Sequence, residues 1–147
     1  MGGDLNGLWN GWYSYLDLGE RVPFTAWLDD DGGSLTGSTM EPNTLSAANV
    51  EELEADVTGN RSGASVMFTK RYRPGQGAHS FAICYQGLVE SDFCLFSGDW
   101  RFENTAFGQG RFLLERASNG LTRAMVRSSA IAAGTSIKGV TQLAKRV

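Results

Sequence analysis

Residues 52–58 read Glu-Leu-Glu-Ala-Asp-Val-Thr, and this stretch alternates polar with apolar side chains. Successive side chains of a β-strand point to opposite faces, so Leu53, Ala55 and Val57 share one face and the polar side chains share the other. The alternation predicts a strand with one face in a core and the other face in solvent. Seven further stretches alternate in a comparable way, and their number decides the fold.

The alternating stretches predict strands at residues 8–16, 22–29, 34–40, 52–59, 65–72, 79–88, 93–102 and 109–116. Glycine-rich turns separate several of them, such as Asp-Asp-Asp-Gly-Gly at 29–33 and Gly-Asn-Arg-Ser-Gly at 59–63. Short strands of this number and spacing are typical of a closed barrel. The sequence therefore predicts an all-β fold, an eight-stranded antiparallel up-and-down β-barrel.

Residues 117–147 differ in charge from the rest of the chain. Residues 1–116 carry all 16 acidic residues, whereas residues 117–147 carry five of the 13 Lys and Arg and no acid. Apolar residues at 121–127 and 130–132 have helical spacing. We predict a barrel domain at 1–116 and a basic, partly helical tail at 117–147, docked on its own barrel or on a neighbour. The dispersed basic residues lack interleaved aromatics, so we expect no nucleic-acid partner.

Composition and motifs exclude several classes of protein. Hydrophobic residues make up 41% of the chain and charged residues 20%, as in ordinary globular proteins. No apolar run reaches the roughly 20 residues of a membrane helix, and the N-terminus lacks a signal pattern, so we expect a cytoplasmic protein without a membrane partner. Strand parity places Cys84 and Cys94 on opposite faces, which predicts two reduced thiols.

Catalytic and metal-binding patterns are also missing from the sequence. The single histidine, His79, has no nucleophile motif near it, and we interpret it as a polar residue at a strand end rather than a general base. Two cysteines and one histidine do not suffice for a structural zinc site. We expect no catalytic residue, no metal and no cofactor, and a function that is not enzymatic.

The predicted barrel interior is strongly aromatic. Its large inward-facing residues are Trp9, Phe24, Phe68, Phe81, Tyr85, Phe96, Trp100 and Phe112. This lining predicts a filled interior or a shallow pocket rather than a large cavity. Candidate ligand-binding residues on the lining are Tyr13, Tyr15, Thr39, Phe68, Lys70, Tyr85 and Trp100. For Lys70 two interpretations stay open: contact at the barrel mouth with the anionic head of a ligand, such as a carboxylate, or extension from its strand end into water.

The opposite, outer face carries apolar residues as well. Trp12, Trp27, Phe93, Leu95 and Leu113 point outward by the same parity. Exposed apolar patches usually have a partner. We expect this one to be covered by the tail or by a second copy of the chain, which predicts a homo-oligomer.

Gly7-Leu8-Trp9 at the start of the first strand, together with a basic residue that ends the last strand, resembles the calycins, the group that includes lipocalins and avidins. The resemblance implies that Arg116, or alternatively Arg111, packs over Trp9. The likeness extends over residues 7–116 to bacterial avidin-like and lipocalin-like domains. Gly11, Thr39 and Glu41 stand where an avidin has groups that hold biotin, so we do not expect biotin binding.

Two functions lead among those that follow from the sequence, and an enzyme such as a barrel-fold isomerase or cyclase is a third hypothesis. The first is a non-enzymatic barrel that binds a small, partly apolar ligand inside. The alternative is a protein-interaction or assembly module with a filled barrel, which acts through its outer apolar face and its tail. A continuous interior cavity of roughly 300 Å³ or more would favour the ligand, whereas a packed interior would favour the module.

Overall fold

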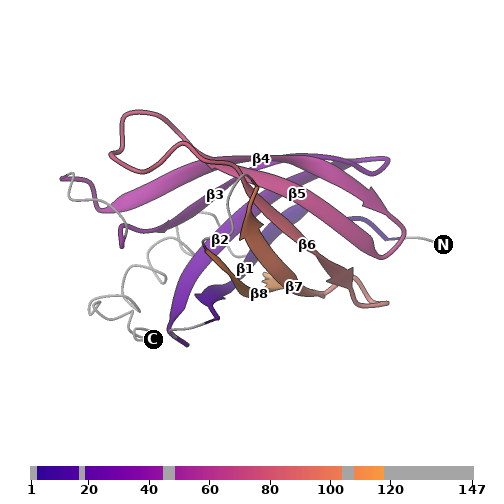
Figure 1. Cartoon of the computed structure of the whole chain (residues 1–147). Coiled ribbons are helices and arrows are strands. Elements are labelled where there is room, and N and C mark those ends of the chain that lie inside the picture. The colour runs from indigo at the N-terminus through magenta and orange to yellow at the C-terminus, as the bar shows by residue number, and fades with distance from the viewer. Residues whose placement is uncertain (1–2, 17–18, 45–48, 104–107, 118–147) are drawn as a thin grey trace.

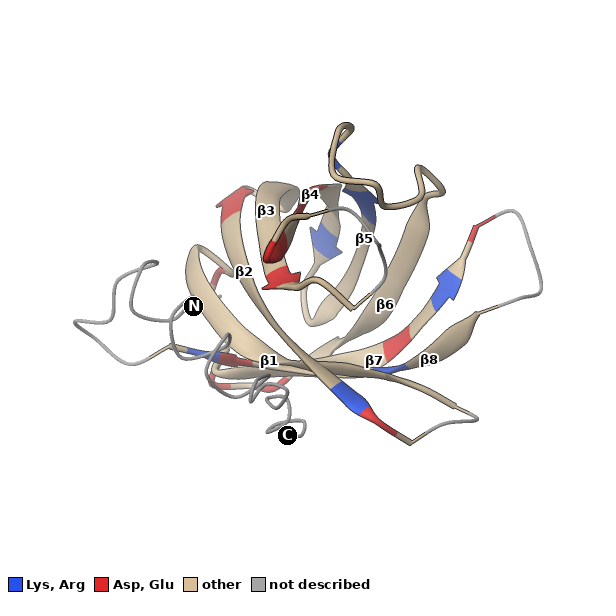
Figure 2. Ribbon diagram, turned by 90° about the vertical axis from the view of Figure 1, so that its left-hand side faces the viewer, with Lys and Arg blue, Asp and Glu red and all other residues tan. Residues whose placement is uncertain are grey.

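The computed structural model describes residues 3–16, 19–44, 49–103 and 108–117, and this part of the chain is a closed barrel of eight β-strands (Figure 1). The strands are Gly7–Tyr15 (β1), Arg21–Asp31 (β2), Ser34–Pro42 (β3), Glu52–Ser62 (β4), Ser65–Tyr72 (β5), Ile83–Val89 (β6), Leu95–Phe102 (β7) and Gln109–Arg116 (β8). Every strand pairs antiparallel with its sequence neighbours, and β8 pairs with β1. The predicted eight-stranded antiparallel barrel is confirmed, and Figure 2 shows the strands around the interior. The partly helical tail predicted at 117–147 lies, apart from Ala117, outside the described residues.

The two-residue alternation decides which side chains fill the barrel. On β4, Leu53, Ala55 and Val57 are buried, whereas Asp56 and Thr58 between and beyond them are exposed. Twenty buried residues form one core, to which all eight strands contribute. Edge-to-face ring contacts link its aromatic members, for example Phe96 to Phe112 at 5.0 Å between ring centres. Burial of this apolar lining stabilises the closed sheet.

Two expectations about the sixth and seventh strands are corrected. Strand β6 begins at Ile83 rather than at residue 79, because residues 73–82 form a loop that contains Pro74 and two glycines with positive φ. Phe81 therefore lies outside the strand, and its side chain is 60% exposed instead of in the core. Strand parity holds only within a strand, so it gave the wrong side for this residue.

The register between β6 and β7 also differs from the expected one. Cys84 lies opposite Arg101, and the turn that joins the strands covers residues 90–94. Phe93 sits in this turn with a φ of 55°, and its half-buried side chain packs against the core rather than pointing outward from a strand. Both cysteines are free thiols, as predicted.

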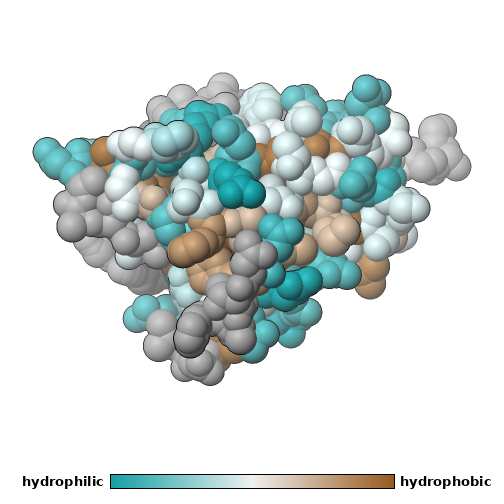
Figure 3. Space-filling view, turned by 45° about the horizontal axis from the view of Figure 1, so that its top comes forward, coloured by the Kyte–Doolittle hydropathy of each residue, from teal (hydrophilic) through white to brown (hydrophobic). Residues whose placement is uncertain are grey.

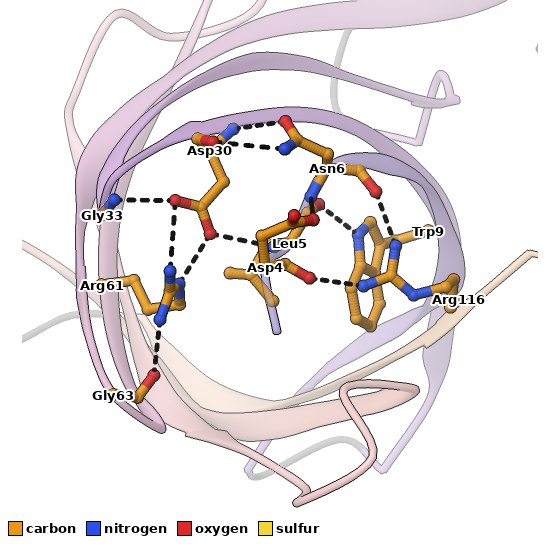
Figure 4. A network of polar contacts seen from close by, with 9 residues as sticks. All are labelled: Asp4, Leu5, Asn6, Trp9, Asp30, Gly33, Arg61, Gly63 and Arg116. Carbon is orange, nitrogen blue, oxygen red and sulfur yellow. Dashed lines mark hydrogen bonds and ion pairs between the residues drawn. The ribbon is translucent and has the colours of Figure 1, made fainter. Parts of the chain in front are cut away.

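One end of the barrel is closed by a cap around Trp9 (Figure 4). The Arg116 guanidinium lies 4.6 Å from the centre of the Trp9 ring, and it donates hydrogen bonds to the carbonyl oxygens of Asp4, Asn6 and Phe93. Trp9 Nε1 donates to the Leu5 carbonyl at 2.9 Å. The contact that the calycin resemblance implied for Arg116 is confirmed.

A buried carboxylate completes this cap. Asp30 accepts hydrogen bonds from the backbone N–H groups of Leu5 and Gly33 and from Arg61 Nε at 2.6 Å. Burial alone raises the pKa of Asp30, but these hydrogen bonds and the charge of Arg61 outweigh it and hold the pKa below its usual value. The cap thus ties the N-terminal segment to the ends of β2, β4 and β8.

Candidate ligand site opposite the Trp9 cap

A fully buried ion pair lies in the barrel interior, between Lys70 on β5 and Glu41 on β3. Lys70 Nζ lies 2.6 Å from Glu41 Oε1, and both side chains are 0% exposed. The Tyr13 hydroxyl donates to Glu41 Oε2 at 2.6 Å, and the Tyr72 hydroxyl lies 3.0 Å from both carboxylate oxygens. A buried ion pair persists only when its remaining hydrogen-bonding capacity is satisfied, and the two tyrosines fulfil that need for Glu41.

Aromatic rings surround the Lys70 ammonium on its other sides. Its nitrogen lies 4.8 Å from the ring centre of Tyr13, 5.0 Å from those of Phe24 and Tyr72, and 5.7 Å from that of Tyr85. A cation within about 6 Å of a ring face is attracted by the ring quadrupole. The partner of Lys70 is thus a carboxylate of its own chain, and neither interpretation drawn from the sequence describes it.

The sequence analysis missed Glu41 as an interior residue because the predicted third strand ended at residue 40. Strand β3 continues to Pro42, and Glu41 lies two residues after the inward-facing Thr39. Extension of the same parity by one residue would have placed this carboxylate on the inner lining, although parity does not show that Lys70 is its partner. Lys70 was assigned to the lining from the sequence, but the predicted strand end at residue 40 left Glu41 out of it.

The tyrosines of this cluster are held neutral. Burial, and secondly the charge of Glu41, raise the pKa of Tyr13, Tyr72 and Tyr85 above the usual value of 10.0. The same two causes raise the pKa of the half-buried Tyr15. A neutral phenol can donate a hydrogen bond, whereas a phenolate cannot. Tyr13 and Tyr72 therefore remain hydrogen-bond donors to Glu41 throughout the neutral pH range.

A small pocket lies above this cluster, at the end of the barrel opposite the Trp9 cap. It is lined by Tyr13, Tyr15, Tyr72, His79, Ile83, Tyr85, Trp100 and Phe102. Its volume is about 10 Å³, which is enough for roughly one water molecule. Four of the candidate ligand-binding residues from the sequence, Tyr13, Tyr15, Tyr85 and Trp100, meet here.

The other three candidate residues lie deeper in the barrel. Phe68 stacks on Tyr85 with 4.9 Å between ring centres and 7° between ring planes. Lys70 is enclosed as described above. Thr39 is buried, and its hydroxyl oxygen has no hydrogen-bond partner among the described residues. These side chains fill the interior beneath the pocket, so the structure contains the predicted shallow pocket and a packed interior.

His79 is a member of the pocket that the sequence analysis assigned only to a strand end. It precedes β6, and its imidazole is held by the rings of Tyr72 at 5.1 Å, Phe102 at 5.2 Å and Phe81 at 5.6 Å. Its Nδ1 atom is buried and has no hydrogen-bond partner in the described part of the chain. Burial lowers the pKa of His79, with a further lowering from Lys70 and an opposing effect of Glu41, so the ring is neutral at pH 7.

The outer residues predicted to form an interface are placed as follows. Trp12 and Leu113 lie directly opposite each other on β1 and β8, and both are half-buried, as is Leu95 on β7. Arg21 covers Trp12, with its guanidinium 4.1 Å from the ring centre. Trp27 on β2 is 38% exposed. On the surface shown in Figure 3, apolar side chains lie in patches between hydrophilic ones.

No protein-family model matches this sequence, and no curated protein matches it either. Among the described residues, no group of three or more His, Cys, Asp or Glu could hold a metal ion. That same part of the chain includes no helix with the length and hydropathy needed to cross a membrane.

Proposed function

We propose that the protein is a non-enzymatic β-barrel that binds a small, partly apolar ligand at the end of the barrel opposite the Trp9 cap. The observation that carries the proposal is the buried Nδ1 of His79, which has no partner among the described residues and belongs to a residue in the wall of an aromatic pocket. Buried polar atoms normally have a hydrogen-bond partner. A ligand hydroxyl or amide that enters the pocket would supply one.

The size of the pocket limits the ligand. A volume of about 10 Å³ admits one water-sized group, far less than the roughly 300 Å³ of a site that encloses a whole ligand. We therefore propose that only a hydroxyl or a similar group enters. The apolar body of the ligand would then lie on the rim, where Tyr15 and Phe102 are half-buried and Phe81 is exposed.

A titration with phenol, followed by the backbone amide signals in NMR spectra, tests this proposal. Phenol combines one hydroxyl with an apolar ring, and its hydroxyl can pair with Nδ1 in either imidazole tautomer. We expect saturable shifts confined to amides near Tyr15, Ile83 and Trp100. His79→Phe keeps a ring at this position but removes Nδ1, and it should weaken binding about tenfold, the equivalent of roughly 1.4 kcal/mol.

The control for this titration is Met67→Ala, on the outer wall of β5, which should leave phenol affinity unchanged. Shifts that do not saturate, or equal affinity in His79→Phe and the natural protein, would contradict the proposal. Native mass spectrometry of the protein from cells provides an independent readout, because a retained small molecule adds to the measured mass.

The packed interior, which lacks the cavity of roughly 300 Å³ that would favour a ligand, is the result expected for an interaction module, and this module is the second candidate function. A filled barrel has little room for cargo, so an interaction module that acts through its outer wall remains a proposal, with a second copy of the chain as the partner. Trp12→Glu should then convert an oligomer to a monomer in native mass spectrometry, whereas Met67→Glu should not. An unchanged mass for Trp12→Glu would reject this interface.

Two further proposals concern family and location. The Trp9–Arg116 contact in a closed eight-stranded barrel supports kinship with the avidin-like and lipocalin-like barrels. The free thiols of Cys84 and Cys94 support a reducing compartment and hence the cytoplasm. Reversible labelling of both thiols in intact cells would test the second proposal.

A further inference from the structure

Four side chains on the outer wall of the barrel are buried. They are Leu8 on β1, Thr25 on β2, and Ser38 and Met40 on β3. Their neighbours Trp9, Ala26 and Thr39 point into the core, so these four point outward. On β4 to β8, by contrast, every outward-pointing side chain is half-buried or exposed. Burial on the outside of a barrel wall means that neighbouring side chains or another segment of protein lie over these four.

These side chains form one continuous surface. Leu8 lies opposite Trp27, and Trp27 lies opposite Ser38. In the adjacent row Thr25 lies opposite Met40. Directly paired residues on one face of a sheet are in side-chain contact distance. We call Leu8, Thr25, Trp27, Ser38 and Met40 the β1–β3 outer face.

The chain leaves the barrel beside this face. After β8 ends at Arg116, the backbone N–H of Ala117 donates to the Leu8 carbonyl at 2.9 Å, and residues 118–147 continue from there. A helix over residues 121–132, where apolar residues have helical spacing, would be roughly 18 Å long. Three neighbouring strands span only about 10 Å. A segment of this length is sufficient to cross the whole β1–β3 outer face.

Charge favours the same arrangement. Residues 118–147 contain five Lys and Arg and no acidic residue. Exposed acids border the β1–β3 outer face: Asp29 follows Trp27 by two residues on β2, and Asp56 on β4 lies opposite Ser38. The tail is attached to the barrel at Ala117, beside Leu8. This attachment raises the local concentration of the tail at the β1–β3 outer face to about the millimolar range, which favours docking on its own barrel over a neighbour.

We propose that residues 118–147 dock on the β1–β3 outer face of their own barrel, with the apolar residues of 121–132 over Trp27 and Met40 and the basic residues toward Asp29 and Asp56. This interaction is independent of the proposed ligand, which binds at the end of the barrel opposite the Trp9 cap. It also assigns the tail to a different part of the wall from Trp12, Leu95 and Leu113.

Paramagnetic relaxation in the full-length chain tests the proposal. Cys84 and Cys94 are replaced with serine, and a nitroxide is attached at Met125→Cys. The nitroxide should strongly reduce the amide signals of Trp27, Ser38 and Met40, and leave those of Met67 and Gln86 on the opposite wall at full intensity. Equal intensity loss on both walls, or none on β1–β3, would overturn the proposal.

Matched variants and a mixing experiment identify the occupant. Met40→Glu should restore the signals of β1–β3, whereas Met67→Glu, the same substitution at a side chain that is 48% exposed, should not. Leu121→Glu in the tail should restore them without touching the barrel. When nitroxide-labelled chains without ¹⁵N are mixed with ¹⁵N-labelled chains without nitroxide, full signal intensity is expected. A loss of intensity in the mixture would show exchange of tails between copies and would refute docking on the same chain.

Discussion

Removal of the Lys70 ammonium is the sharpest perturbation of the barrel interior. Lys70→Met keeps an unbranched apolar side chain of similar length but leaves the Glu41 carboxylate fully buried with only Tyr13 and Tyr72 as donors. Loss of one partner from a buried ion pair costs about 3–5 kcal/mol. Glu41→Gln leaves the ammonium without its carboxylate and should cost a similar amount.

The double variant Lys70→Met/Glu41→Gln distinguishes a coupled pair from two independent contributions. Additive effects would sum to about 6–10 kcal/mol, which equals or exceeds the whole stability of many domains. Because neither charge then remains buried alone, we expect the double variant to lose little more than one single variant, a coupling energy of about 3 kcal/mol or more.

Urea unfolding monitored by tryptophan fluorescence measures these free energies, provided that the dependence on urea concentration stays the same among the variants. The exposed pair Arg111–Asp99 supplies the control. Its atoms are 2.9 Å apart but its side chains are 61% and 74% exposed, so Arg111→Met should change stability by less than about 1 kcal/mol. A cost below 1 kcal/mol for Lys70→Met, or strict additivity in the double variant, would refute the buried pair.

Three other predictions address the tyrosines, the histidine and the cap. Because burial and Glu41 raise the pKa of all four tyrosines, the native protein should show no tyrosinate absorbance near pH 10. Its stability should fall as the pH rises above 10, until unfolding exposes the phenolates. Tyrosine titration of the native protein near pH 10 would contradict this prediction. Because the pKa of His79 is lowered, stability should decrease as pH falls from 7 through 6, and His79→Phe should flatten that dependence in urea titrations. Arg116→Met removes the cation over Trp9 and three hydrogen bonds, and the free energy of unfolding should fall by about 1–3 kcal/mol in urea titrations. An unchanged unfolding midpoint would show that these contacts do not stabilise the barrel.

Alternation in the sequence was sufficient to predict the closed barrel and most of its core. In a half-buried strand every second side chain is apolar, and residues 52–58 follow this pattern, with charged or polar side chains between Leu53, Ala55 and Val57. The period fails where a strand ends. Phe81 was assigned to the core because it continues the alternation of Ile83 and Tyr85, but the strand begins only at Ile83.

The candidate site was predicted in part. Tyr13, Tyr15, Tyr85 and Trp100 were correctly brought to one interior, because parity alone determines the side on which they lie. Contacts across the barrel depend on register and strand length, which local patterns do not specify. For that reason the sequence showed Lys70 on the lining but did not show Glu41 beside it, and it placed His79 at a strand end without indicating the pocket.

The state of the Lys70 ammonium tests the central claim most directly. In ¹H–¹⁵N spectra that select lysine side chains, the structure predicts one ammonium signal protected from exchange with water, with proton contacts to the rings of Tyr13, Phe24, Tyr72 and Tyr85. Lys70→Met should remove this signal. An ammonium of Lys70 that exchanges as fast as a surface lysine, without contacts to these rings, would show that the barrel interior is not built as described.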